Sequence, residues 1–280
     1  MKIRILIRSF FLISFFSMEA QETIGINLDL KTEPTAKADF TESSIVLSYS
    51  KKTDTKNKIT NTLAYSNLNV NYEPGSYKTR ENQEHFNQIK NNFKISHDFS
   101  NTFNMSFSIV PTVNFQSSPG LDDTSLLGSL EMNQQFNSKA RLTIGISRSA
   151  VLGNPKFLPV VSFNYKFSNE SSLLIGFPDS KISYSNNIRN TFNLTNSFNG
   201  NFYHLDEAKQ GIDNAAKATL SQMTTAFEYE RNVDQNWFLN FKAGYDFDKK
   251  YSRTDKDNHR VYDFNTGNSY VLGIGIKYKQ

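Results

Sequence analysis

The chain contains no cysteine among its 280 residues. This absence excludes disulfide bonds, thiolate metal sites and the lipid anchor of a lipoprotein, because each of them needs a cysteine sulfur. Tryptophan occurs once, whereas Phe occurs 24 times and Tyr 13 times. Beyond the N-terminal segment no run approaches the roughly 18 consecutive apolar residues of a membrane-spanning helix, so we expect no such helix.

Residues 1–20 have the pattern of a secretory signal peptide. Three basic residues lie within the first eight positions, Phe10–Phe16 is a short apolar run, and Met18–Ala20 offers a cleavage site. The apolar run is shorter than the about 20 residues that span a bilayer. We therefore expect residues 1–20 to be removed and residues 21–280 to form one domain. The alternative is a buried N-terminal strand or helix.

The chain also lacks an excess of charge of one sign. Residues 21–280 keep 28 of the 31 basic and 26 of the 27 acidic residues, a net charge of +2. A balance so close to neutral creates no strong field for a nucleic acid or an acidic partner. We expect no nucleic-acid partner.

Alternation of apolar and polar residues is abundant. Phe103–Ile109, Val161–Phe167, Trp237–Phe247 and Tyr270–Tyr278 each place their apolar residues at every second position. This period predicts strands with one apolar face, since a helix would scatter the same residues around its axis. The mean hydropathy of −0.53 is compatible with a membrane protein of this kind. In a membrane barrel, each lipid-facing residue alternates with a polar one that faces the lumen.

Six short polar turns interrupt the alternation, and longer connections lie between them. The turns are Asp54–Lys58, Phe99–Phe103, Phe136–Ala140, Phe167–Ser171, Phe198–Phe202 and Arg231–Trp237. Short turns at one end and long loops at the other are typical of an outer-membrane β-barrel. We predict an all-β fold, a transmembrane antiparallel up-and-down β-barrel of 12–14 strands. A soluble β-sandwich and an eight-stranded ligand barrel are the alternatives.

Two strands of this count are weakly defined. Pro178 interrupts the run 172–184, which is allowed only at a bulge or a rim, and the run 202–206 after 188–198 is short. We expect the longer connections at 31–42, 73–85, 117–124, 151–156, 206–216 and 249–265, and a helix-compatible composition marks 206–218. An even strand number returns both termini to the periplasmic side, where the short turns also belong.

The C-terminal strand bears on biogenesis. Gly273, Ile276 and Tyr278 have a spacing that resembles the C-terminal assembly signal of outer-membrane barrels, although the chain continues through Lys279 and Gln280. The resemblance implies an outer-membrane location and contact with the barrel assembly machinery. Basic residues mixed with the acidic residues of 249–260 predict a solvated loop that touches lipopolysaccharide phosphates.

A second resemblance lies in the middle of the chain. Phe157–Pro159, then Phe163 and Tyr165, then Gly176–Tyr184 resemble the centre of an uncharacterised family of outer-membrane β-barrels from Bacteroidota, a domain of unknown function. The resemblance implies the barrel fold and its location, and it brings no activity or catalytic residue. Read mechanically, a glycine and a proline there bend a strand where the wall turns inward or meets a loop.

Residues suited to catalysis or metal binding form no clear constellation. His204 and Asp206 with Ser221 suggest a lipid hydrolase, but no serine lies in a Gly-x-Ser-x-Gly turn. Asp255–His259 lacks the turn glycine and distal glutamate of a calcium loop. His97 follows the apolar alternation and is expected in the barrel wall. We therefore expect no enzyme, no cofactor and no metal.

Charged residues opposite the apolar faces of their strands are the remaining functional candidates. They either line a channel or pair across the lumen and close it. The candidates for lining the lumen are Lys90, Lys94, Glu131, Arg141, Lys166, Arg189, Lys242 and Asp246. We predict a channel or passage for small solutes. The alternative is a closed structural barrel whose loops bind a partner or lipopolysaccharide.

Overall fold

The computed structural model describes residues 22–73, 83–206 and 215–280, so the predicted signal peptide lies outside the described residues. The described chain forms strands and their connections, and none of it forms a helix long and apolar enough to cross a membrane. The strands are β1 (Glu22–Pro34), β2 (Ala38–Lys52), β3 (Asn57–Tyr72), β4 (Gln83–Asp98), β5 (Phe103–Phe115), β6 (Thr124–Gln135), β7 (Ala140–Ser149), β8 (Lys156–Lys166), β9 (Ser171–Phe177), β10 (Asp179–Asn187), β11 (Asn190–His204), β12 (Lys217–Asn232), β13 (Trp237–Thr254), β14 (Arg260–Asp263) and β15 (Ser269–Lys279).

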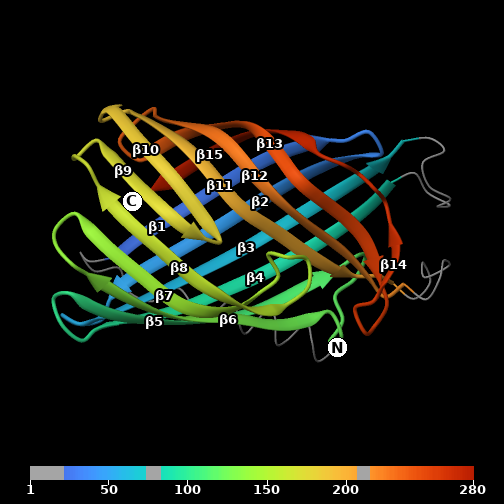
Figure 1. Cartoon of the computed structure of the whole chain (residues 1–280), viewed down its shortest axis with the longest axis horizontal. Helices are drawn as coiled ribbons and strands as arrows, with labels where there is room; N and C mark the ends of the chain where they lie inside the picture. The colour runs from blue at the N-terminus through green and yellow to red at the C-terminus, as the bar shows by residue number, and fades with distance from the viewer. Residues whose placement is uncertain (1–21, 74–82, 207–214) are drawn as a thin grey trace.

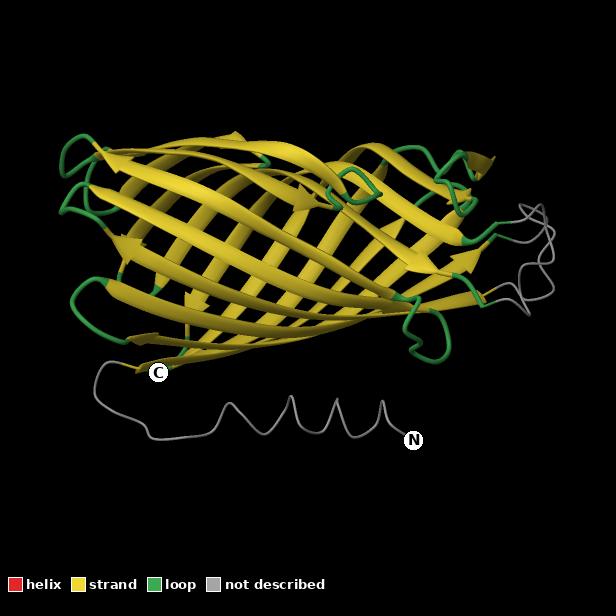
Figure 2. Ribbon diagram, turned by 90° about the horizontal axis from the view of Figure 1, so that it is seen from below, coloured by secondary structure: helices red, strands yellow, loops and turns green. Residues whose placement is uncertain are grey.

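Fourteen of these strands close into one antiparallel barrel. Strands β1 to β13 pair in sequence order, and β15 pairs with both β13 and β1 (Figures 1 and 2). The first and last strands pair from Gly25↔Lys279 to Thr32↔Leu272, and this pairing closes the barrel. Strand β14 pairs only with the far end of β13 and lies outside the ring. The predicted all-β barrel of 12–14 strands is therefore confirmed.

The two ends of the barrel differ in their connections. The turn end carries the short turns at 53–56, 99–102, 136–139, 167–170 and 233–236, together with the start of β1 and the end of β15. The opposite end, which we call the loop end, carries the connections at 116–123, 150–155 and 255–268. The part of 206–218 expected to have helical composition lies mostly outside the described residues.

Several predicted boundaries are wrong. The run 172–184 is the β9–β10 hairpin with Pro178 at its tip, and 188–198 and 202–206 are the single strand β11. The predicted turn Phe198–Phe202 therefore lies inside β11, whose pairing with β12 is unbroken from Asn190 to His204. The predicted long connections 31–42 and 249–265 are also wrong in part, because β1 and β2 pair as far as Pro34↔Asp39 and β13 continues to Thr254. One predicted strand is thus two strands and two predicted strands are one, so the predicted number of strands is unaffected.

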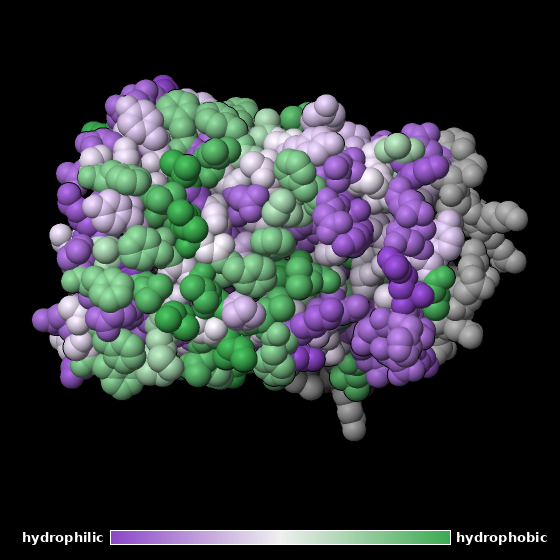
Figure 3. Space-filling view, viewed as in Figure 1, coloured by the Kyte–Doolittle hydropathy of each residue, from purple (hydrophilic) through white to green (hydrophobic). Residues whose placement is uncertain are grey.

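The character of the outer surface changes along the barrel axis. On the face shown in Figure 3, hydrophobic side chains gather toward the turn end and hydrophilic ones beside β14. An apolar band facing hydrocarbon is expected of a membrane barrel. Exposed members of this band include Ile26, Leu28, Leu30, Ile45, Leu47, Phe93, Ile95, Phe107, Ile109, Ile144, Ile146 and Ile274.

At the loop end the inward face of a strand is apolar and its outward face is polar, the reverse of the arrangement in the apolar band. Along β3, Asn67, Asn69 and Asn71 alternate with Leu68 and Val70, and the apolar residues are the buried ones. The inward apolar residues form one packed cluster inside the barrel: Ala38, Phe40, Leu68, Val70, Tyr72, Phe86, Tyr203, Leu205, Ala215, Ala218, Leu220, Tyr251 and Phe264. The loop end thus has the core of a water-soluble β-structure, which fills the lumen there.

Candidate functional site: the barrel lumen

The lumen is hollow at the turn end. A cavity of about 890 Å³, the mouth cavity, is lined by turn residues such as Asp54 and Asn101 and by strand residues such as Lys94, Glu131 and Arg141. Because turn residues form its rim, the mouth cavity opens at this end of the barrel. Its lining is mostly polar, as the inward positions of a membrane barrel are.

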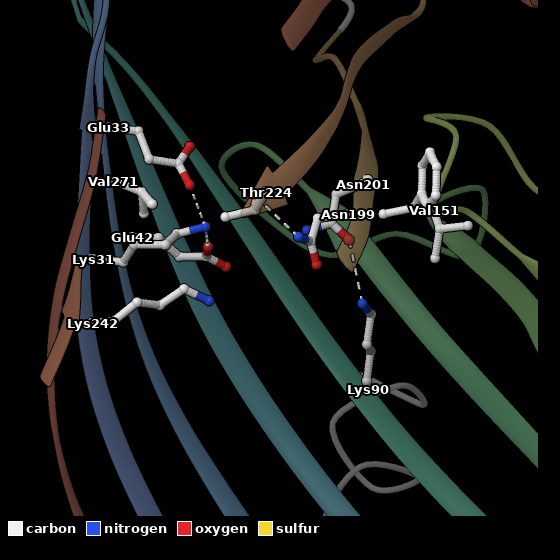
Figure 4. A pocket seen from close by; sticks show the side chains of 12 residues that line it. Lys31, Glu33, Glu42, Lys90, Val151, Asn199, Asn201, Thr224, Lys242 and Val271 are labelled. Carbon is white, nitrogen blue, oxygen red and sulfur yellow. Dashed lines mark hydrogen bonds and ion pairs between the residues drawn. The ribbon is translucent and has the colours of Figure 1, made fainter. Parts of the chain in front are cut away.

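A second, smaller hollow lies deeper, against the packed loop end. This inner cavity of about 310 Å³ has Lys31, Glu33 and Glu42 on the β1–β2 wall, and Lys90 and Asn201 on the opposite side (Figure 4). Its lining also includes Val151, Phe198, Asn199, Gly200, Thr224, Lys242 and Val271.

An ion-pair network fixes the β1–β2 wall of the inner cavity. Lys31 Nζ lies 2.8 Å from Glu33 Oε1 and 2.9 Å from Glu42 Oε2. Glu33 also accepts hydrogen bonds from Lys249 and, at 3.0 Å, from Gln222. Charges taken out of water are tolerated only when paired and hydrogen-bonded, so each glutamate here is held by a lysine.

A second polar network lies within the apolar cluster of the loop end. Glu84 is paired with Arg253 and accepts hydrogen bonds from Tyr72 at 2.7 Å and Tyr251 at 3.2 Å. The Tyr251 ring stacks on Phe264 with 4.4 Å between ring centroids. Burial raises the pKa of both tyrosines well above its ordinary value. Together the cluster and this network close the loop end of the lumen.

The barrel wall is incomplete near the inner cavity, where the β9–β10 hairpin ends while β11 continues (Figure 1). Pairing between β10 and β11 stops at Asp179↔Ser197, and pairing between β8 and β9 stops at Val161↔Phe177. The loop 150–155 covers the gap: a Cβ placed on Gly200 would lie 2.5 Å from the carbonyl oxygen of Ala150. Pro178 at the tip of the hairpin is therefore at a rim, as the sequence predicts.

Beyond this gap, β11 reaches across to β4 and β5. Tyr203 stacks on Phe86 with 4.9 Å between ring centroids, and Gln88 Nε2 donates to Asn201 Oδ1 at 3.2 Å. Strands β6 to β10, which lie between β5 and β11 in the sheet, are shorter than β11. Toward the loop end β11 therefore contacts β4 and β5 directly. These contacts place Asn199 and Asn201 over the lumen.

The predicted lumen residues fall into three groups. Lys90 and Lys242 line the inner cavity, and Lys94, Glu131 and Arg141 line the mouth cavity. Two of them pair with carboxylates: Lys94 Nζ lies 3.0 Å from Glu131 Oε2, and Lys242 Nζ lies 3.1 Å from Glu228 Oε1.

The other three predicted lumen residues line neither cavity. Asp246 is fully buried and accepts hydrogen bonds from Thr224 at 2.6 Å and Ser269 at 3.0 Å. Lys166 is exposed at the end of β8, and Arg189 is exposed in the β10–β11 turn.

Sequence reasoning missed Glu33, Glu42, Glu84, Lys249 and Arg253, because it assigned most of their segments to long loops. The signal that points to them is the change of faces along a strand. Alternating asparagines opposite Leu68 and Val70 indicate that a strand has left the membrane and turned its apolar face inward.

The hydrolase constellation does not assemble. His204 pairs in register with Lys217 and Gly200 with Ser221, which places His204 and Ser221 four residues apart, roughly 13 Å. The carboxylate near His204 is that of Asp123, at 3.4 Å from Nδ1, and not that of Asp206. Burial lowers the pKa of His204, and Asp123 opposes this shift.

The other two histidine-containing sites lie at opposite ends of the barrel. His97 lies at the turn end, where Nδ1 is 2.7 Å from Asn57 Oδ1 and the ring contacts Phe99. Asp255 and Asp257 lie near His259, with potential ligand atoms within 4.8 Å of one another. Asp255 accepts hydrogen bonds from the backbone N–H groups of His259 and Asp257 in the same turn. These hydrogen bonds lower the pKa of Asp255, and the one from His259 has the largest effect.

Solved structures share this fold. A deletion mutant of the TodX monoaromatic hydrocarbon channel matches with a TM-score of 0.51 and 9% identity, covering 94% of this chain and 91% of that one. The COG4313 outer membrane channel from Pseudomonas putida F1 matches with a TM-score of 0.50 and 7% identity, covering 95% and 98%. At such identities the likeness shows the barrel fold alone. No curated protein matches the chain.

The family assignment rests on the sequence of nearly the whole barrel. A family model described as a domain of unknown function, DUF6268, matches residues 27–279, from the first strand to the last. This match agrees with the resemblance drawn from the centre of the chain. The chain belongs to the DUF6268 family of domains of unknown function.

Proposed function

We propose that this protein is a passage for small solutes across an outer membrane. The observation that carries the proposal is a polar lumen: the mouth cavity and the inner cavity follow the same face of β4, on which Lys94 and Lys90 lie four residues apart. A 14-strand barrel is wide enough to leave such space, whereas an eight-stranded one is filled by its own side chains.

The packed loop end requires that passage be gated. The apolar cluster and the Glu84–Arg253 pair fill the lumen above the inner cavity, so a solute crosses only when these contacts rearrange. The same packing is the observation that favours the second candidate, a closed barrel whose loops bind a partner. A barrel of that kind would let no solute through.

The location and partners belong to the same proposal. The apolar band would lie in outer-membrane lipid, the loop end would face outward toward lipopolysaccharide, and the turn end would face the periplasm. The segment 1–20 would be cleaved on secretion, and β15 would be read by the barrel assembly machinery. The composition, rich in Asn, Lys and Phe, supports a source among Bacteroidota. A role in passage, without catalysis, is supported by two channels among the structures of similar fold.

Uptake into liposomes tests the proposal. Protein purified from outer membranes is reconstituted, and entry of radiolabelled pentose, hexose and trisaccharide is compared with entry into liposomes that carry heat-denatured protein. We expect the pentose and hexose to enter faster than the trisaccharide, because the inner cavity is small. Equal, slow entry of all three with native and denatured protein would support the closed barrel instead.

A further inference from the structure

The inner cavity contains one cation that is in ion-pair contact with no carboxylate of the described residues. Its wall carries three lysines and two glutamates. Lys31 holds both glutamates, and Lys242 is paired with Glu228 at 3.1 Å. Lys90, which extends from β4 on the opposite side, forms no such ion pair with any described residue (Figure 4).

The hydrogen bonding of Lys90 is also incomplete. An ammonium group carries three N–H donors. Within the described residues, Lys90 Nζ has one acceptor, Asn201 Oδ1, at a long 3.3 Å. The same oxygen accepts from Gln88 Nε2 at 3.2 Å, so it is shared between two donors. The half-buried Lys90 therefore holds a charge and two N–H groups directed at a hollow instead of at a protein partner.

The surroundings favour an anionic guest at this position. A charge surrounded by low-dielectric protein attracts its counter-charge more strongly than it does in water. The amide group of Asn201 lies beside Lys90, whereas that of Asn199 donates to Thr224 Oγ1 at 3.1 Å (Figure 4). Apolar Val151 and Phe198 line the same cavity. The glutamates of the far wall are already paired with lysines, which weakens their repulsion of an anion. A volume of about 310 Å³ lies at the lower end of small-molecule sites.

We propose that the inner cavity binds the carboxylate of a small solute through Lys90, with Asn201 holding the ammonium group in position. The inference rests on the proposed function and names its solute class: a monomeric organic acid carrying one carboxylate. The Asn201 amide beside Lys90 contacts a polar group of the solute, and the body of the solute occupies the space toward Val151 and Phe198.

Gluconate and glucose form a matched pair of probes, because they have similar size and differ in charge. Their uptake into liposomes is compared for the native protein and for Lys90→Met, Lys90→Arg and Lys139→Met, each shown first to be a heat-modifiable folded barrel. Lys139 is exposed in the β6–β7 turn, so its variant controls for the loss of one charge.

We expect Lys90→Met to lower the gluconate-to-glucose uptake ratio roughly fivefold or more, as the loss of a charged hydrogen bond does. Lys90→Arg should retain most of the ratio, and Lys139→Met should leave it unchanged. An unchanged ratio in Lys90→Met overturns the carboxylate site and leaves the passage standing. Failure of both solutes to enter counts against the passage.

A binding measurement tests the carboxylate site independently of the passage. Isothermal titration calorimetry of gluconate is carried out on the detergent-solubilised barrel, with glucose as the neutral control. Gluconate binding that Lys90→Met abolishes and Lys139→Met preserves supports the site even where nothing is taken up. Absence of gluconate binding to the native protein overturns it.

Discussion

At the scale of single residues, the loop end contains charged side chains with almost no solvent contact. The side chains of Lys249 and Asp246 are 0% exposed, and that of Glu33 is 2% exposed. Removing one partner of such a group leaves an uncompensated buried charge, which costs far more than the intact pair contributes. The stability of this region therefore depends on every buried charge having a partner of opposite charge, and less on the number of ion pairs.

Adjacent lysines allow this dependence to be measured. Lys249→Met leaves Glu33 and Asp246 short of a cation and should lower the free energy of unfolding by about 3–5 kcal/mol. Lys250 pairs with Asp248 at the surface, with 56% of its side chain exposed, so Lys250→Met should change that energy by about 1 kcal/mol or less. Urea titration in lipid vesicles gives both values. Equal losses would contradict the buried network.

The two buried tyrosines predict a loss of stability at high pH. Their folded-state pKa values are raised by burial, so the neutral phenol is favoured in the folded state. Their contribution is complete below the unfolded pKa of about 10 and falls as pH rises above it, because only the unfolded state then releases the protons.

Tyrosinate absorbance during an alkaline titration checks this expectation. Exposed tyrosines ionise in the folded barrel, and buried tyrosines ionise only when it unfolds. In the variant with both Tyr72→Phe and Tyr251→Phe, the absorbance gained on unfolding should decrease, and the absorbance gained in the folded barrel should stay the same. Early ionisation of either tyrosine would show that the loop end is open to water.

At the scale of elements, the loop 150–155 is the part of the wall that covers the gap above the β9–β10 hairpin. It rests on Gly200 of β11, and an alanine Cβ there would lie 2.5 Å and 2.6 Å from the carbonyl oxygens of Ala150 and Val151. Since both atoms belong to the backbone, the loop must move to admit the methyl group. Gly273 of β15 has ordinary contacts, the nearest at 3.4 Å.

Gly200→Ala should therefore make the loop 150–155 sensitive to subtilisin, and Gly273→Ala should not. The fragments identified by mass spectrometry locate the cut. Resistance of the Gly200→Ala barrel at native levels would show that the loop does not depend on its contact with β11.

Sequence reasoning located most strands because alternation is a local signal. It failed where tertiary contacts override local composition. Phe198–Phe202 has the residues of a turn, but continuous pairing with β12 makes it strand, and a loop distant in sequence covers its glycine. Of the predicted lumen residues, Lys90 and Lys242 line the inner cavity. Glu33 and Lys249, 216 residues apart, meet only after the barrel closes.

At the scale of the whole molecule, the exchange of faces divides the barrel into a membrane section and a water-exposed section. Leu47 is an outward residue of the apolar band, 40% exposed, whereas Asn71 is an exposed residue at the loop end. Arginine on the lipid face costs about 2–4 kcal/mol near the bilayer centre and about 0–1 kcal/mol near the interfaces.

Leu47→Arg should therefore destabilise the folded barrel in vesicles by about 2–4 kcal/mol, and Asn71→Arg by about 1 kcal/mol or less. Urea unfolding in vesicles of a single lipid composition measures both. A larger loss for Asn71→Arg would show that the membrane lies elsewhere on the barrel.

The most direct test of the central claim, a gated passage closed at the loop end, is single-channel conductance in a planar bilayer. The native protein is compared with the variant carrying Glu84→Gln and Arg253→Met, which removes both charges of the buried pair together. We predict stepwise currents of equal amplitude in both, with a larger share of open time in the variant. Folded, heat-modifiable barrels that give no steps in either form would contradict the claim.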